Sequence, residues 1–372
     1  MIFGVERNED VKKHLKNKNV GLVLNQASLT HSGLTTFDVL KEHCKIKALF
    51  ALEHGIRGAF KAGEDITCED GIDDRPVISL YHGDGCGLKE EEVKELDAIV
   101  YDVQDLGLRF YTYVASLKIL EEDCNRFGLE LIILDRPCPF GRMVWGNILP
   151  SDSLSFVGPD NLTISYGMTP GEIALWFAKR KEHTTLPTVI KLEDWNGKPY
   201  WKDSWKWIRT SPNIPDFDTA FLYSGMCFIE GCTLSEGRGT DKPFRTFGAP
   251  WIDSALLLKK LESYELSGFS FKATAFIPKE SKHKDTICHG LEISVTDHKT
   301  AKPVKLGLVI LSICFDLWDD TKELIGTNGL SHMDKLIGKG SLSKIIDDPL
   351  KVYAEWEKES ETFKKGGIYL YG

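Results

Sequence analysis

Five short apolar runs recur in the first part of the chain, at 20–25, 46–51, 76–81, 98–103 and 129–135. They lack the regular polar alternation of a half-exposed strand, which is typical of strands buried on both faces of a parallel sheet. Segments with apolar residues at helical spacing lie between them, at 35–43, 90–96 and 111–128. The alternation predicts an α/β fold, with a Rossmann-like, doubly wound and mostly parallel sheet covered by helices.

The pattern changes in the second half of the chain. A helix is predicted over 168–182, where Thr169 is suited to the N-cap and Glu172 completes a capping box. Residues 183–252 are rich in Trp, Pro and Gly and predict long loops. After a helix near 253–262, two strand-like and two helix-like segments follow. We therefore expect a catalytic domain over 1–262 and a smaller α+β auxiliary domain over 263–372.

Composition narrows the class of protein. The 372 residues are 42% hydrophobic and 27% charged, which excludes disordered and fibrous chains. With 46 basic and 55 acidic residues, the net charge of -9 disfavours nucleic acid and anionic membrane surfaces as partners. The longest apolar run, 306–315, is too short for membrane insertion. The first residues do not resemble a signal peptide, so a cytoplasmic protein is expected, the alternative being an exported protein whose signal is absent from this sequence.

Known cofactor motifs do not occur. The nine cysteines form no CxxC pair, so neither a disulfide framework nor a thiolate zinc site is indicated, and most are expected to be reduced thiols in the core. The GDGCGL segment at 83–88 has Leu88 where a dinucleotide fingerprint needs its third glycine. There is also no Walker A spacing, no zinc-binding HExxH and no GxSxG elbow. We therefore predict no metal and no cofactor.

Polar residues gather instead where four predicted strands end. They are Asn25; Glu53, His54 and Arg57; Asp102, Gln104, Asp105, Arg109, Tyr111 and Tyr113; and Asp135 with Arg136. The carboxyl ends of parallel strands share one edge of a sheet, where ligands bind in this architecture. The sequence thus predicts a polar cleft at that edge.

These candidates differ in how well a structural role explains them. A loop cap or ion pair is the better interpretation for Asp135 and Arg136, and a turn role for His54 alone. Glu53 is a poor choice for a helix cap, and its place beside Leu52 and a glycine turn favours partial burial and use as a general acid. Most of the tryptophans at 195, 201, 205 and 207 are expected to pack loops, with one or two offering a platform for a sugar.

At these residues the sequence resembles the bacterial exo-β-N-acetylmuramidases, a glycoside hydrolase family formerly catalogued as a domain of unknown function. The resemblance is carried by LEHGIRG (52–58), YDVQDLGLRFYTY (101–113), LDRPCPFG (134–141), YGMTPGEIA (166–174), TSPNIPDFDTAFLYSG (210–225), IEGCTLSEGRGTDKPFRTFGAPW (229–251) and YLYG (369–372). These motifs span nearly the whole chain. The family usually has histidine before GMT, where this chain has Tyr166, and many members carry an export signal that is not seen here.

The resemblance implies a Rossmann-like domain followed by a smaller one, and release of terminal N-acetylmuramic acid from non-reducing ends of peptidoglycan fragments. It also implies that Glu53 is the catalytic glutamate. The second catalytic group stays open: Asp105, Glu230 and Glu236 are the candidate carboxylates, and the alternative is the substrate's own 2-acetamido group. We assign Asp105 and Glu236 to catalysis beside Glu53. The residues assigned to substrate binding are Asn25, His54, Arg57, Gln104, Arg109, Tyr111, Asn213, Tyr223, Glu230 and Arg238.

Selectivity for the muramic sugar requires a cation for its lactyl carboxylate, and Arg57, Arg109 and Arg238 are the candidates, each with an ion pair as the alternative role. The competing functions are a carbohydrate- or nucleotide-binding module without turnover and, more weakly, a cysteine-dependent acyl hydrolase using Cys68 or Cys86.

Overall fold

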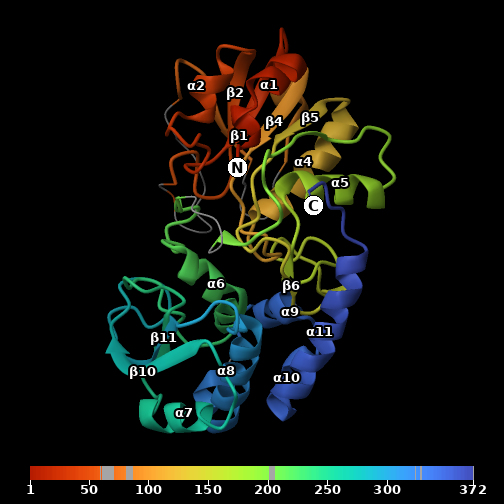
Figure 1. The fold of residues 1–372 in the computed structure, drawn as a ribbon. Helices are drawn as coiled ribbons and strands as arrows, with labels where there is room; N and C mark the ends of the chain where they lie inside the picture. The colour runs from red at the N-terminus through yellow and green to blue at the C-terminus, as the bar shows by residue number, and fades with distance from the viewer. Residues whose placement is uncertain are drawn as a thin grey trace. The chain divides into compact units, whose positions relative to one another are not determined.

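The computed structural model describes residues 1–58, 60, 71–80, 87–200, 206–322, 324–326 and 329–371. The chain forms two compact units (Figure 1). The first contains Met1–Met143, Tyr166–Pro212 and Gly366–Gly372, and the second contains Val144–Ser165 and Asn213–Lys365. Each unit is therefore assembled from segments that are separated in the sequence.

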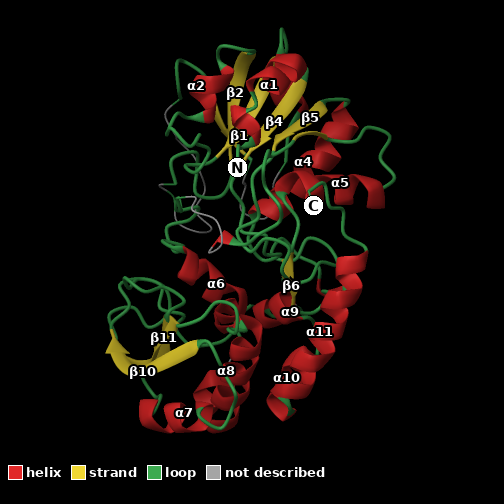
Figure 2. Cartoon of the chain, viewed as in Figure 1, coloured by secondary structure: helices red, strands yellow, loops and turns green. Residues whose placement is uncertain are grey.

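The first unit contains a six-stranded sheet, whose strands are drawn in yellow in Figure 2. All its strand pairs are parallel, in the order β3-β2-β1-β4-β5-β8. The strands are β1 (Asn19–Leu24), β2 (Lys45–Ala51), β3 (Val77–Ser79), β4 (Ala98–Asp102), β5 (Glu130–Leu134) and β8 (Thr188–Ile190). The chain order reverses between β1 and β4, which is the switch point where open α/β sheets bind ligands. The predicted fold class is confirmed.

One helix precedes β1, and four more lie between strands of this sheet. They are α1 (Asn8–Leu15), α2 (Thr36–Leu40), α3 (Glu90–Val93), α4 (Tyr113–Phe127) and α5 (Pro170–Arg180). Helix α4 ends at Gly128, whose φ of 70° is left-handed and favours glycine. Helix α5 starts with the predicted capping box, in which the Thr169 hydroxyl accepts from the Glu172 N–H and the Glu172 carboxylate accepts from the Thr169 N–H.

The C-terminal segment returns to the first unit. The Tyr371 hydroxyl donates to Asp135 Oδ2 at 2.6 Å and accepts from the Leu192 N–H at 3.0 Å. The Tyr371 ring also packs edge-on against Trp195, with 5.2 Å between ring centroids. Trp195 therefore has the loop-packing role that was expected for most tryptophans of this region.

The second unit combines an antiparallel sheet with helices. The strand order is β10-β11-β9, formed by β9 (Thr246–Ala249), β10 (Phe269–Phe276) and β11 (Cys288–Val295). The helices are α6 (Phe217–Met226), α7 (Ser254–Leu261), α8 (Pro303–Leu317), α9 (His332–Ile337), α10 (Ser341–Asp347) and α11 (Pro349–Lys365). Helix α8 contacts α6, α7, α10 and α11, and it forms the core of this unit because 12 of its 15 residues are buried.

Two glycines allow α6 and α8 to approach closely. A Cβ atom added at Gly225 would meet the Pro303 carbonyl oxygen at 1.9 Å, and one at Gly307 would meet the Gly225 oxygen at 2.4 Å. Side chains at either position would push the helices apart. The glycines of the segments 210–225 and 305–320 thus have a packing role in this unit.

The expected domain boundary at 262/263 does not coincide with the division in the structure. Strand β9 pairs with β11, and α6 packs on α8, so residues 213–262 belong to the second unit together with Val144–Ser165. The two-stranded sheet of β6 (Val144–Trp145) and β7 (Ser165–Tyr166) lies at the ends of that inserted segment. Helix α6 was missed in the sequence because nine of its ten residues are buried, which leaves no polar face to mark a helical period.

Two general features concern the described part of the chain. Its helices include none that is both long and apolar enough to cross a membrane. Its cysteines are all free, and every one except the half-buried Cys44 is buried. The expectation of reduced core thiols is met for these residues, whereas Cys68 and Cys86 lie outside the described residues.

Candidate active site

Glu53 lies on the turn that follows β2, at the carboxyl edge of the parallel sheet. Its exposed fraction is 8%, and its Oε2 atom accepts a hydrogen bond from the Thr112 hydroxyl. The turn is sharp because His54 and Gly55 both have left-handed backbones, with φ of 77° and 74°. The His54 ring lies on the same turn, with Nδ1 2.9 Å from the Phe60 carbonyl oxygen, so Nδ1 carries the proton.

Two tyrosines adjoin Glu53. The Tyr113 hydroxyl donates to the Thr210 carbonyl oxygen at 2.9 Å and lies 3.5 Å from the Glu53 carbonyl oxygen. The Tyr111 hydroxyl donates to Thr210 Oγ1 at 3.0 Å, and the two rings pack edge to face with centroids 4.9 Å apart. Burial raises the pKa of both tyrosines above the ordinary value, so both remain neutral donors. They connect the Glu53 turn to the segment that contains Thr210.

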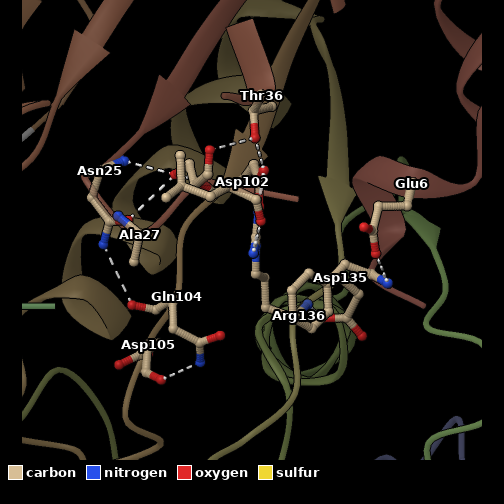
Figure 3. Close-up of polar contacts among 12 residues, drawn as sticks. Glu6, Asn25, Ala27, Thr36, Asp102, Gln104, Asp105, Asp135 and Arg136 are labelled. Carbon is tan, nitrogen blue, oxygen red and sulfur yellow. Dashed lines mark hydrogen bonds and ion pairs between the residues drawn. The ribbon is translucent and has the colours of Figure 1, made fainter. Parts of the chain in front are cut away.

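Asn25 and Gln104 join the strand exits at the switch point (Figure 3). Asn25 Oδ1 accepts from the Ala27 N–H at 3.0 Å, and Nδ2 donates to the Gln104 carbonyl oxygen at 3.4 Å. Gln104 Nε2 donates to the carbonyl oxygens of Asp105 at 2.8 Å and Pro137 at 2.9 Å. Both amides were predicted to bind substrate, and in this structure they fix the loops after β1, β4 and β5.

Asp105 is buried beside them. Its Oδ1 accepts from the Leu106 N–H at 2.6 Å, and its Oδ2 accepts from the Tyr166 hydroxyl at 3.0 Å. Burial raises the pKa of Asp105 to about 6, although the hydrogen bonds from Leu106, Tyr166 and Gly107 oppose this effect. Tyr166 thus contacts a carboxyl group that was assigned to catalysis.

Asp102, Asp135 and Arg136 lie at the ends of β4 and β5 and have structural contacts. Arg136 holds Asp102 through two hydrogen bonds, of 2.5 Å from Nε and 2.8 Å from Nη2 (Figure 3). Asp135 accepts from the Thr169 hydroxyl at 2.7 Å and from the Gly171 N–H at 2.8 Å, and so caps α5. Burial raises the pKa of Asp135 to about 7. The structural interpretation of Asp135 and Arg136 agrees with these contacts, although the ion-pair partner of Arg136 is Asp102.

The two candidate binding arginines of the first unit, Arg57 and Arg109, have contrasting surroundings. Arg109 is fully buried, with an exposed fraction of 0%, whereas Arg57 is exposed on the Glu53 turn. The first unit contains eight of the predicted site residues, and only Arg57 among them is exposed. They are Asn25, Glu53, His54, Arg57, Gln104, Asp105, Arg109 and Tyr111.

The other predicted site residues lie in the second unit and form a charged cluster there. Arg238 donates to Glu230 Oε1, at 2.5 Å from Nη2 and 3.1 Å from Nε, and its Nε lies 3.3 Å from Glu236 Oε1. Glu236 Oε2 lies 2.9 Å from the Lys282 ammonium. Burial acts to raise the pKa of Glu230, but Arg238 and His332 outweigh it and hold that pKa well below the ordinary value. Glu230 and Glu236 therefore both form ion pairs with basic side chains.

Two neutral candidates complete this unit. Tyr223 is buried and packs edge-on against Phe244, with centroids 4.6 Å apart, while the Arg238 guanidinium lies 5.2 Å from the Phe244 ring centroid. Asn213 is half-buried, just before α6. No group of three His, Cys, Asp or Glu side chains suited to a metal ion occurs among the residues described.

Sequence reasoning missed Thr112 and Thr210. Thr112 lies in the YDVQDLGLRFYTY segment and Thr210 begins the TSPNIPDF segment, so both belong to motifs that the sequence analysis had identified. A single threonine, however, does not indicate in the sequence which residue it will contact. Two of the tryptophans considered as sugar platforms, at 201 and 205, lie outside the described residues, as does most of the GDGCGL segment.

Comparison with family models and with a curated relative shows which proteins this chain is similar to. A family model described as exo-beta-N-acetylmuramidase NamZ, N-terminal, matches residues 20–218, and its C-terminal counterpart matches residues 221–368. The chain is 37% identical over 366 residues to peptidoglycan beta-N-acetylmuramidase NamZ of Bacillus subtilis (strain 168), covering 96% of this chain and 87% of that protein.

Solved structures with the same fold are also similar to the chain. Two crystal structures of DUF1343 family proteins from Bacteroides fragilis NCTC 9343 resemble the chain. One is 28% identical with a TM-score of 0.86, covering 100% of this chain and 99% of that one. The other is 27% identical with a TM-score of 0.77, covering 98% and 96%. The chain therefore belongs to the exo-beta-N-acetylmuramidase NamZ family and is an enzyme of the glycosidase class.

Proposed function

We propose that this enzyme releases terminal N-acetylmuramic acid from the non-reducing ends of peptidoglycan fragments, with Glu53 as the general acid. The observation that carries the proposal is the position of Glu53 at the carboxyl edge of the sheet, on the turn after β2, in a chain of the NamZ family. The Bacillus subtilis relative is named as a peptidoglycan beta-N-acetylmuramidase, which supports the choice of substrate.

The contacts of Glu53 suit an acid with a defined proton position. Oε2 accepts a hydrogen bond from the Thr112 hydroxyl, and in this proposal Oε1 is the oxygen that gives its proton to the substrate. As the glycosidic C1–O bond breaks, this proton passes to the leaving oxygen, and an oxocarbenium-like charge develops on the sugar. The neutral Tyr111 and Tyr113 beside Glu53 add no charge of their own to the site.

For the second catalytic role we propose the substrate's own 2-acetamido group. Both oxygens of Asp105 already accept hydrogen bonds, and Glu230 and Glu236 are held in ion pairs with Arg238 and Lys282. The acetamido oxygen would bond to C1 as the leaving group departs with the proton of Glu53. Water would then attack C1, break the bond between C1 and the acetamido oxygen, and give a proton to the Glu53 carboxylate. The product would first appear as the β-anomer, which proton NMR of a fresh digest detects; an α-anomer would exclude this route.

The general-acid role is tested with Glu53→Gln, which keeps the shape of the side chain and removes the proton donor. Turnover of a muramic acid–glucosamine disaccharide is expected to fall by about 10²–10⁴, whereas an aryl muraminide with an acidic phenol as leaving group should lose much less. Glu9→Gln, an exposed change on α1, is the matched control and should leave both rates unchanged. Equal losses on the two substrates, or a near-normal rate on the disaccharide, would contradict the assignment. A binding module without turnover would release no sugar from either.

A further inference from the structure

A cavity of about 500 Å³ lies in the first unit. Its lining comes from the N-terminal segment, the loops after β1, β4 and β5, and the segment 206–209. The contributing residues include Phe3, Leu29, Gln104, Arg136, Trp207 and Arg209. Its volume is in the range of small-molecule sites, and it lies at the switch point of the sheet, where this architecture binds ligands. None of the proton transfers proposed above uses it.

Aromatic rings line part of the cavity, and the basic side chains of Arg136 and His31 already have acidic partners. The Phe3 ring stacks on His31 with centroids 4.1 Å apart, and the Arg136 guanidinium lies 4.8 Å from the Phe3 centroid. Arg136 is bound to Asp102, and His31 Nδ1 lies 2.7 Å from Glu6 Oε2. These groups shape the cavity but offer no unmatched positive charge.

Arg209 and Lys206 are different, because both are exposed and line the same cavity. Within the part of the chain that the structure describes, neither side chain forms an ion pair with a carboxylate. In a protein with a net charge of -9, two such cations beside an apolar cavity favour a small ligand that has both an apolar part and a negative charge.

The backbone of Arg209 is tied to the Glu53 turn. Its carbonyl oxygen accepts from Gln26 Nε2 at 3.1 Å, and the Gln26 side chain lies against Gly58, where an added Cβ would meet Gln26 Cδ at 2.7 Å. Gly58 ends the turn that contains Glu53. The next residue, Thr210, is held by the hydroxyls of the two tyrosines that adjoin Glu53. The backbone of Arg209 is thus linked, through Gln26 and through Thr210, to the turn that contains Glu53.

We propose that Arg209 binds the carboxylate of the 3-O-lactyl group of the terminal sugar, and that the cavity beside it receives this substituent. The proposal rests on the proposed function, because the lactyl group is what distinguishes N-acetylmuramic acid from N-acetylglucosamine. A guanidinium binds a carboxylate through two parallel hydrogen bonds, and the lactyl methyl group suits the apolar wall. The carboxylate and the scissile bond belong to one sugar ring, so the proposal requires Arg209 and Glu53 to contact the same bound sugar.

The three arginines expected from the sequence are less suited to this role. Arg238 is engaged with Glu230 and Glu236, and Arg109 has no exposed surface. Arg57 is exposed on the Glu53 turn but does not line this cavity. It is the natural competing assignment and is tested alongside Arg209.

The test pairs a change in the protein with a change in the substrate. kcat/KM is measured for an aryl β-N-acetylmuraminide and for its lactyl methyl ester, using the wild type and Arg209→Gln. If Arg209 binds the carboxylate, kcat/KM of the variant should be about 10- to 100-fold lower than that of the wild type for the acid substrate and little changed for the ester. Esterification of the substrate should likewise lower kcat/KM of the wild type far more than that of the variant. Arg209→Lys should recover only part of the loss, since lysine keeps the charge but not the fork.

Binding gives a readout that does not require turnover. Calorimetric titration with free N-acetylmuramic acid and with its methyl ester should show that Arg209→Gln weakens binding of the acid alone. Arg126→Gln, which removes an exposed charge on α4, should change neither affinity. Equal effects of Arg209→Gln on acid and ester, no effect on either, or the acid-specific loss appearing with Arg57→Gln would overturn the proposal. A wild type that releases no sugar from muraminides would instead refute the proposed function.

Discussion

Asp105 offers a quantitative test of how burial controls a carboxyl group of this enzyme. Burial raises its pKa from 3.8 to about 6, so between these pH values the unfolded chain loses a proton that the folded chain keeps. The free energy of unfolding therefore falls as pH rises through this window, and the contribution of Asp105 is constant above it. A difference of about two pKa units corresponds to about 3 kcal/mol.

Asp105→Asn isolates this effect. Asparagine has nearly the same shape, its Oδ1 continues to accept from the Leu106 N–H, and its amide can donate to the Tyr166 oxygen. Because the amide never ionises, the variant should gain about 3 kcal/mol relative to the wild type between pH 4 and pH 7. Urea unfolding of both proteins at several pH values measures the difference. Other titrating groups, including Asp135, cancel in that comparison.

The result that would refute this reasoning is a stability difference between the two proteins that is the same at pH 4 and at pH 7. It would show that Asp105 ionises as easily in the folded chain as in the unfolded one. Tyr166→Phe provides the complementary change, since it removes a hydrogen bond that favours the ionised carboxylate. It should extend the pH window upward and so increase the total loss of stability across it.

Three further predictions concern the scaffold and the chemistry. Arg136→Leu should lower the free energy of unfolding by about 3–5 kcal/mol, because it leaves Asp102 buried without its cation, and adding Asp102→Asn should recover part of the loss in thermal unfolding. Gly128→Ala should cost about 1 kcal/mol in urea unfolding, since an added Cβ meets nothing within 4 Å and only the left-handed φ opposes it. Dialysis against EDTA should leave the rate of sugar release unchanged; a loss that zinc or manganese restores would contradict the prediction of a metal-free reaction.

The sequence by itself determined the architecture of the first unit and the position of the candidate acid. Buried strands leave continuous apolar runs, and a capping box or a closing glycine has its own local signal, so β1, β2, α5 and the end of α4 were all predicted. Glu53 was one of several polar residues at strand exits, and it was singled out because glutamate is a poor helix cap and because the family resemblance implies that it is catalytic. These signals depend only on neighbours in the chain.

Only the tertiary structure showed which segments and side chains contact each other over long distances in the sequence. Helix α6 has almost no exposed face, so its place in the second unit follows from its contact with α8 and not from any periodicity. The partners of charged groups were equally hidden. Arg136 pairs with Asp102 across strands, Arg238 is neutralised by two glutamates, and Arg209 is brought beside the Glu53 turn through Gln26. The sequence shows which residues carry a charge. Whether a charged side chain has an oppositely charged partner depends on residues that only folding places next to it.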